Sequence, residues 1–311
     1  MKYCPECGVV LLQNAKFCHE CGEKIPATVA SKATHVTDDP RPSASEKTEK
    51  PKQAPKVPPK QAEPLHWEIP SSLEHDALVE GIKANFFKAL RERVTEQHRE
   101  EQYADYVEIF YQSRFNDALL SRASLLVDDI RQLQKRGINP SVETQQLLTK
   151  TYDGLLDYFI VNYCQGINDF PIPASILKYE NATWASVNLR TMILDYLDFE
   201  HEKETVYTDF VVMPLQKLKN ASTSFLTPEK NEKIFLICDQ TVFGSCKEGF
   251  ALTEKGLYWK AHLESPHHIL YKDLASISRK QEWIIVNDLF FNCNKSLNIK
   301  LLKLLKKIKN L

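Results

Sequence analysis

Four cysteines near the start of the chain have the type and spacing of metal ligands: Cys4, Cys7, Cys18 and Cys21. Two C-x-x-C pairs with ten residues between them can bring four sulfur atoms to the corners of a tetrahedron around one zinc ion. Thiolate is a soft anionic ligand that suits Zn²⁺, and four thiolates leave no position for a reactive water molecule. The pattern therefore predicts one structural zinc ion rather than a catalytic one.

Arg93 and His98 form a second pair that could do chemistry, because they match the R-x4-H spacing of the active site in helical HEPN ribonucleases. In that chemistry His98 would act as the general base on a ribose 2′-hydroxyl, and Arg93 would stabilise the phosphorane. Arg91 also stands at a permitted spacing from His98, and a chain with ten arginines and nine histidines produces such matches by chance. We therefore expect an exposed polar helix face here, with a ribonuclease as the alternative.

Other catalytic signatures are missing from the sequence, which contains no G-x-S-x-G, no glycine-rich phosphate loop and no H-E-x-x-H. The chain is therefore predicted not to be an enzyme. His262, His267 and His268 stand close together and could hold a second metal with Cys246, although an exposed loop is the simpler expectation. Single buried thiols are expected at the remaining cysteines, Cys164, Cys238, Cys246 and Cys293.

The composition of the 311-residue chain suits two or three folding units. The formal net charge is −1, from 40 basic and 41 acidic residues, so any contact with nucleic acid or membrane must come from a local patch. No run of 18 or more apolar residues is present, and the first residues lack the apolar core of a signal peptide. We therefore expect a cytoplasmic protein without a transmembrane helix, in which clustered cysteines hold metal.

Composition and apolar spacing change along the chain in a way that predicts a multidomain α+β protein. Residues 26–65 are rich in Pro, Lys, Glu, Ser and Thr, and 27–64 contain no aromatic residue, so a disordered linker is expected. Helical spacing follows, and then the two-residue period of β-strands. The predicted domains are a zinc ribbon at 1–25, the linker at 26–65, an α-helical domain at 66–228 and a β domain at 229–311.

Apolar stripes set out the helices of the middle domain. One stripe covers residues 115–133 and is followed by a basic turn and a glycine. Pro140 suits the start of the next helix, and a further helix is predicted over 184–199. Nearer the start of the domain, another stripe has an apolar residue at every fourth position, at Leu78, Ile82, Phe86 and Leu90.

The C-terminal domain is expected to be a curved antiparallel sheet of six or seven strands, capped by one amphipathic helix that contains Leu297 to Leu311. The sequence Glu254-Lys255-Gly256 between two apolar runs predicts a hairpin. Strands are predicted at 234–237, 250–253, 257–260, 269–271, 275–277, 283–286 and 289–291.

Two parts of the chain resemble known families. The first 25 residues resemble the short zinc ribbons of bacterial multidomain proteins. The segments Gly249–Trp259 and Ile269–Leu274, together with the final helix, resemble bacterial pleckstrin-homology-like (PH-like) domains. This second resemblance implies a two-sheet β-sandwich whose last helix covers one open end. Such domains bind phospholipid headgroups in some proteins and proteins in others, and carry no fixed catalytic set.

Basic residues of the β domain allow two interpretations. A basic mouth for an anionic headgroup is possible, although ordinary surface positions are the simpler expectation. The lysines of the final helix, Lys303, Lys306, Lys307 and Lys309, would suit a membrane-surface helix, but we expect its apolar face to cover the sheet. The residues of the candidate mouth are Lys247, Lys255, Lys260, Lys272, Arg279 and Lys280.

These observations predict a non-enzymatic cytoplasmic adaptor, in which a structural zinc ribbon and a PH-like domain recruit partners, a protein partner first among them. Nucleic-acid binding through the ribbon and the basic linker is the alternative, and phospholipid binding through the PH-like domain is a further option. A ribonuclease centred on Arg93 and His98 is the third hypothesis. The oligomeric state stays open. The linker lysines are Lys47, Lys50, Lys52, Lys56 and Lys60.

Overall fold

The computed structural model describes Ile25, Trp67 and residues 74–135 and 140–311. The chain divides into two units, Met1–His66 and Trp67–Leu311, and the fold described below is that of the second unit. The cysteines predicted to bind zinc and the predicted linker at 26–65 lie outside the described residues. Both therefore stay predictions.

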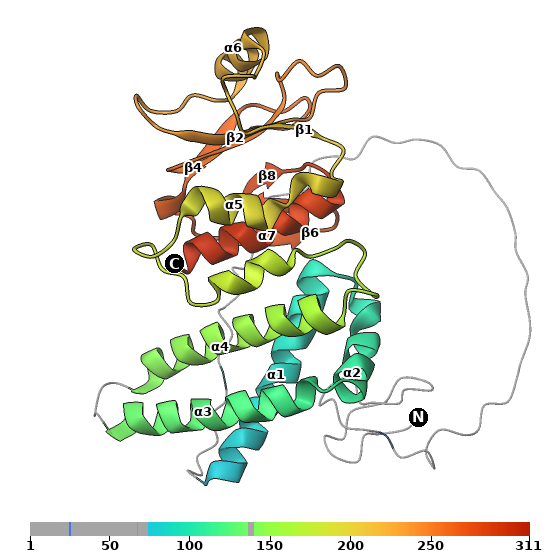
Figure 1. Cartoon of the computed structure of the whole chain (residues 1–311), viewed down its shortest axis with the longest axis vertical. Coiled ribbons are helices and arrows are strands. Elements are labelled where there is room, and N and C mark those ends of the chain that lie inside the picture. The colour runs from blue at the N-terminus through green and yellow to red at the C-terminus, as the bar shows by residue number, and fades with distance from the viewer. Residues whose placement is uncertain (1–24, 26–66, 68–73, 136–139) are drawn as a thin grey trace, which may run out of the picture. The chain divides into compact units, whose positions relative to one another are not determined.

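The middle region is α-helical, as predicted from its apolar spacing (Figure 1). The stripe from Leu78 to Leu90 is the buried face of the first long helix. The helix predicted over 184–199 begins at Leu189, five residues later than predicted, because the side chain of Asn188 accepts a 3.0 Å hydrogen bond from the amide of Thr191 and caps the helix there. The helices are α1 (His75–Gln97), α2 (Tyr103–Gln112), α3 (Phe115–Lys135), α4 (Pro140–Tyr163) and α5 (Leu189–Leu197), with short 3₁₀ turns at Glu100–Gln102, Ala174–Tyr179 and Phe199–His201.

Aromatic side chains fill the space between these helices. Phe115 on α3 and Phe159 on α4 have ring centroids 4.7 Å apart, and Phe86 on α1 lies 5.4 Å from Phe115. Trp67 packs on Tyr152 at 4.5 Å, so the start of the second unit is anchored on α4. Aromatic pairs at these separations stabilise a core beyond the area that they bury. These aromatic side chains therefore have a packing role.

The C-terminal region consists of two antiparallel sheets and a final helix. Neighbouring strands in each sheet follow one another in the chain, so short turns join most of them. The predicted hairpin is present, with Leu252 opposite Leu257. The first sheet contains β1 (Thr205–Tyr207), β2 (Ile234–Asp239), β3 (Gly249–Thr253), β4 (Gly256–Lys260) and β5 (His267–Leu270); the second contains β6 (Ile277–Lys280), β7 (Trp283–Val286) and β8 (Leu289–Phe291).

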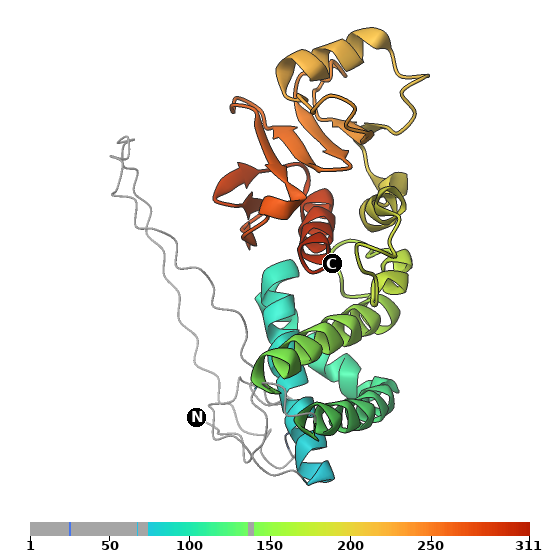
Figure 2. The same cartoon turned by 90° about the vertical axis from the view of Figure 1, so that its left-hand side faces the viewer.

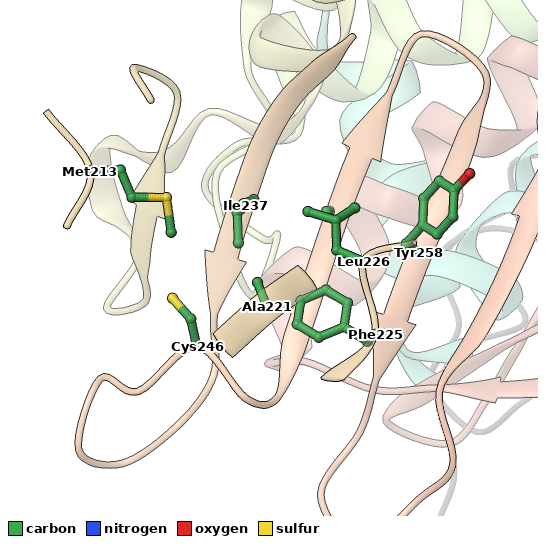
Figure 3. Close-up of a cluster of buried hydrophobic side chains, with 8 residues drawn as sticks. Met213, Ala221, Phe225, Leu226, Ile237, Cys246 and Tyr258 are labelled. Carbon is green, nitrogen blue, oxygen red and sulfur yellow. The ribbon is translucent and has the colours of Figure 1, made fainter. Parts of the chain in front are cut away.

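Two elements N-terminal to the predicted boundary at residue 228 belong to this β region. β1 pairs with β2, with Val206 opposite Cys238. Helix α6 (Leu215–Ser224) buries Ala221 and the following Phe225 in the same hydrophobic cluster as Ile237 of β2 (Figure 3). β1 was not predicted because three residues in a polar segment carry too little periodic signal.

The final helix, α7 (Lys295–Lys309), contacts α5 and the strands β6 and β7 (Figures 1 and 2). Its apolar residues are buried, among them Leu301, Leu304 and Leu305. Asn294 caps its start by accepting a 2.8 Å hydrogen bond from the amide of Leu297. The apolar face therefore covers protein, as predicted. Among the described helices, none combines the length and apolar character needed to span a bilayer.

Candidate functional site: an exposed apolar patch

Apart from Leu263 in the loop between β4 and β5, five large apolar side chains on the β region lie in solvent rather than in a core. They come from two segments, one that precedes and starts α6 and one that joins β2 to β3. Because large apolar side chains gathered at a surface commonly mark an interaction site, we treat this set as the candidate functional site. The apolar patch, as we call it, consists of Val211 (94% exposed), Val212 (75%), Leu215 (79%), Val242 (92%) and Phe243 (96%).

Val242 and Phe243 occupy the tip of a tight turn between β2 and β3. The amide of Gly244 donates a 3.0 Å hydrogen bond to the carbonyl of Thr241, which places Val242 and Phe243 at the two central positions of the turn. Gly244 follows with φ +64°, a left-handed conformation that glycine adopts without strain. The two apolar side chains are therefore held at a defined place on the surface.

Asp239, buried at the end of β2, closes this loop from inside. Its carboxylate accepts hydrogen bonds from the amides of Thr241 and Cys246, at 2.9 and 3.2 Å. At the loop's base the amide of Gln240 donates a 3.1 Å hydrogen bond to the carbonyl of Glu248. Such backbone donors stabilise a buried carboxylate, and the carboxylate in turn gives the buried amides a hydrogen-bond acceptor in place of water. The loop thus keeps its shape without any contribution from the apolar residues at its tip.

The second segment of the patch is held by a turn and by one buried anchor. The amide of Val211 donates a 2.9 Å hydrogen bond to the carboxylate of Asp209. Met213 points into the core and is buried. Pro214 then starts α6, a position at which its missing N–H costs nothing. Val211 and Val212 consequently remain outside, next to a fixed side chain.

The two segments lie beside each other. Met213 and Cys246 belong to the same buried cluster (Figure 3). Asn220 on α6 donates a 2.8 Å hydrogen bond from its side chain to the carbonyl of Ser245, and the hydroxyl of Ser224 donates one of 2.5 Å to the carbonyl of Lys247. α6 is therefore bonded along the β2–β3 loop, so the segment that starts α6 and this loop are neighbours.

Lysines accompany the patch. α6 carries Lys217 and Lys219 and has no acidic residue, and Lys247 is exposed at the end of the β2–β3 loop. The ammonium of Lys217 donates a 2.7 Å hydrogen bond to the hydroxyl of Tyr207, and this bond raises the pKa of Lys217. Lys217 is therefore charged at neutral pH. Apolar tips beside lysines suit a surface that is apolar inside and anionic at its boundary.

The structure places Arg93 and His98 in the interior rather than on an exposed helix face, so that expectation was wrong. The guanidinium of Arg93 donates two 2.7 Å hydrogen bonds to the carboxylates of Asp153 and Asp157 on α4. The ammonium of Lys303 on α7 donates a 2.6 Å bond to the same carboxylate of Asp157. This polar helix face is buried because the carboxylates of α4 neutralise Arg93, and Lys303 of α7 covers it by pairing with Asp157.

We name this cluster, made of Arg93, Asp153, Asp157 and Lys303, the buried ion cluster. Burial by itself would raise the pKa of Asp157, but the charges of Lys303 and Arg93 outweigh burial and hold that pKa below its usual range. Burial would lower the pKa of Arg93, and the two aspartates instead raise it. The charges of Arg93, Asp157 and Lys303 therefore persist in the interior because they face one another, whereas the side chain of Asp153 is half-exposed.

His98 is only 4% exposed and lies between the rings of Tyr106 and Phe170. Neither ring nitrogen of His98 has a hydrogen-bond partner among the described residues. Burial, followed by the nearby positive charges of Lys303 and Arg93, lowers the pKa of His98 to about 3. His98 is therefore neutral and enclosed, an arrangement that does not present it to a ribose hydroxyl.

The three histidines that could have held a second metal are dispersed. His262 lies 3.0 Å from the carboxylate of Glu248, and His268 stacks on Tyr258. His267 and His268 line a small cavity of about 150 Å³ at the end of α6. Cys246 belongs instead to the buried cluster beneath the patch. In the parts of the chain that the structure describes, no group of three or more His, Cys, Asp or Glu side chains could hold a metal ion.

The candidate headgroup residues are partly engaged elsewhere. Lys255 forms a 2.5 Å ion pair with Glu229. Arg279 donates a 3.0 Å hydrogen bond to the carbonyl of His98 and so joins the β region to α1. Lys247 lies beside the apolar patch. We therefore assign the charge near the candidate site to the lysines of α6 and to Lys247.

Sequence reasoning missed the patch, although a signal was present. Val242 and Phe243 directly precede Gly244, and Val211 and Val212 precede Met213-Pro214. Both are apolar pairs at positions where turn chemistry favours polar residues. Comparisons of the chain with protein-family models, with curated proteins and with solved structures find no match. The functional argument therefore relies on the residues themselves.

Proposed function

We propose that the protein is a non-enzymatic adaptor, in which a zinc ribbon held by Cys4, Cys7, Cys18 and Cys21 and the C-terminal β region recruit different partners. The observation that carries this proposal is the apolar patch, which a hydrogen-bonded frame presents to solvent. As part of it we assign the two sheets and α7 to a PH-like β-sandwich capped by a helix. Two antiparallel sheets followed by a buried helix support that assignment.

We propose an anionic lipid surface as the partner of the patch. Val242 and Phe243 stand at the tip of a turn, and a tip inserts into a bilayer interface more readily than it fills a flat protein interface. The lysines beside it would meet lipid phosphates, each contributing about 1 kcal/mol near an anionic membrane. The buried frame means that little ordering entropy is lost on binding.

The ribbon would bind a protein partner at the other end of the chain. Four thiolates close the coordination sphere of zinc, so the metal would stabilise the fold of residues 1–25 rather than react. A tether between two binding modules raises the effective concentration of one near the target of the other. An adaptor of this kind would bring its protein partner to a lipid surface.

The lipid half of the proposal is tested with full-length protein and sedimented vesicles of phosphatidylcholine, with or without phosphatidylglycerol. We expect binding only to the anionic vesicles, weakening as salt is added. Val242→Ser with Phe243→Ser should weaken it about tenfold, because roughly 1.4 kcal/mol of apolar burial is lost. Lys219→Gln with Lys247→Gln should weaken it about thirtyfold, at about 1 kcal/mol per lysine.

Leu263→Ser is the matched control, because Leu263 is 88% exposed but lies in the loop between β4 and β5. It should bind vesicles as the unchanged protein does. Anionic vesicles that fail to sediment the protein, or that sediment the serine double variant equally well, would overturn the lipid assignment. Binding of a purified protein that is lost in that variant, without vesicle binding, would assign the patch to a protein partner.

The zinc half is tested by metal analysis and by a chelator. We expect one zinc per chain in the full-length protein and none in Cys18→Ser. Chelation should unfold residues 1–25 and leave the α-helical and β regions folded, which their unchanged unfolding midpoint would report. A preparation with intact thiols and no metal, or loss of the β region on chelation, would contradict this half.

A further inference from the structure

Two of the four cysteines expected to be single buried thiols lie together. Cys238 is fully buried in β2, and Cys293 is half-buried in the segment between β8 and α7. Cys238 pairs in register with Phe250 of β3, and the ring of Phe250 lies 5.6 Å from that of Phe291, two residues before Cys293. The two thiols are close enough to share a hydrogen bond. A carboxylate oxygen of Glu204 lies 4.0 Å from the sulfur of Cys293. Residues that are 55 positions apart in the chain therefore share one site.

Two further hydrogen bonds hold the segments around Cys238 and Cys293 in place. The side chain of Gln240, two residues after Cys238 and on the same face of β2, donates a 3.2 Å hydrogen bond to the carbonyl of Asn292. The amide of Cys293 donates a 2.8 Å hydrogen bond to the side chain of Asn298 on α7. The neighbours of both cysteines are thus tied to each other or to α7, which holds the two backbone segments together.

Glu204 is held in place as well. The side-chain amide of Asn294 donates 2.8 Å hydrogen bonds to the carboxylates of Glu204 and Glu202. Glu202 in turn accepts a 2.8 Å bond from the ammonium of Lys300. A carboxylate fixed next to a thiol can accept its proton.

We propose that Cys238 and Cys293 form a disulfide when a hydroperoxide reaches Cys293, which makes the pair an oxidant-sensitive modification site. The partial exposure of Cys293 selects it as the thiol that reacts first. Cys238 has the complementary role, because it is buried and the bond to Cys293, followed by burial, raises the pKa of its thiol. The thiol of Cys238 therefore stays protonated until the sulfur of Cys293 has been oxidised.

The chemistry balances in two steps. In the first, the sulfur of Cys293 attacks the hydroperoxide and gives up its proton by way of Glu204; an S–O bond forms, the O–O bond breaks, and an alcohol or water leaves. The product is the sulfenic acid of Cys293. In the second step the sulfur of Cys238 attacks that sulfur, an S–S bond forms, the S–O bond breaks, and water leaves with the Cys238 proton.

The disulfide would join β2 to the short segment that precedes α7. A crosslink between residues so far apart in the chain restricts the unfolded state, so it should raise the unfolding midpoint. The inference does not depend on the proposed lipid or zinc binding.

The experiment treats the full-length protein with hydrogen peroxide, blocks free thiols with N-ethylmaleimide and maps tryptic peptides by mass spectrometry. Trypsin releases Cys238 and Cys246 together in residues 234–247, and Cys293 in residues 281–295. The Cys246→Ser variant therefore identifies the linked sulfur. We expect a crosslink between these two peptides in the unchanged protein and in Cys246→Ser, together with a higher unfolding midpoint without reductant.

Two variants separate the steps. Cys293→Ser should abolish both the crosslink and the rise in midpoint. Cys238→Ser should leave the sulfenic acid of Cys293 without its partner, so that dimedone labels residues 281–295. An oxidant dose that modifies the N-terminal cysteines but produces no link between the two peptides would overturn the proposal. A rise in the unfolding midpoint that persists in Cys293→Ser would also overturn it.

Discussion

The buried ion cluster and the apolar patch both depart from the usual distribution, in which charged side chains lie at the surface and large apolar ones lie in the core. In the first, Arg93, Asp157 and Lys303 are charged and enclosed. In the second, Val242 and Phe243 are apolar and exposed. The charges are tolerated inside because each faces an opposite charge, whereas nothing in the fold needs the apolar tips. Stability therefore resides in the first region, and capacity to bind resides in the second.

The largest effect is expected from Asp157→Asn in the buried ion cluster. Asparagine keeps the shape of the side chain but removes the negative charge that faces both Arg93 and Lys303. Leaving buried cations without that partner should lower the unfolding free energy by about 3–5 kcal/mol, as measured by urea denaturation.

Asp153→Asn is its matched control. Asp153 contacts Arg93 at the same 2.7 Å, but its side chain is 50% exposed and water can replace the lost charge. We expect a loss of about 1 kcal/mol or less. Equal losses for the two variants would show that enclosure does not distinguish the two aspartates.

An intermediate effect on the unfolding free energy is expected when the pH is lowered, because His98 is buried. Its folded pKa of about 3 lies below the unfolded value of 6.5. Between these values the unfolded chain binds a proton that the folded protein excludes, so stability is complete above pH 6.5 and falls as the pH falls. The slope should be about 1.4 kcal/mol per pH unit.

Comparison with His98→Phe isolates this contribution, because phenylalanine keeps an aromatic ring between Tyr106 and Phe170 and cannot be protonated. Other acid-sensitive groups, such as Asp157 and Asp169, are retained in that variant. Its unfolding free energy should fall less steeply between pH 6.5 and 4. Identical slopes would mean that His98 is accessible to protons in the folded protein.

The smallest effect on stability is expected in the apolar patch. Phe243→Ala should change the unfolding free energy by no more than about 0.5 kcal/mol, because the side chain is already in solvent. Phe250→Ala, seven residues away and fully buried in β3, should cost about 3–5 kcal/mol. A substantial loss from Phe243→Ala would give the patch a structural role and weaken the proposed function.

Local elements were predictable to the extent that their pattern is periodic. The stripe at Leu78 to Leu90 identified α1, and the alternation around Gly256 identified the β3–β4 hairpin. β1 was missed because its pairing with β2 depends on a strand about 30 residues further along the chain. The candidate site was missed because exposure of Val242 and Phe243 follows from a turn whose frame is Asp239.

Local patterns specify the apolar face of α7, the buried faces of the long helices and the order of most strands, since each follows from neighbours within a few residues. The contact of Lys303 with Asp157, 146 positions away, and the enclosure of Arg93 and His98 follow instead from the folded arrangement. That arrangement also brings Cys238 to Cys293. The physical reason is that burial and charge pairing depend on which distant surfaces cover a residue, and no local pattern encodes the covering element.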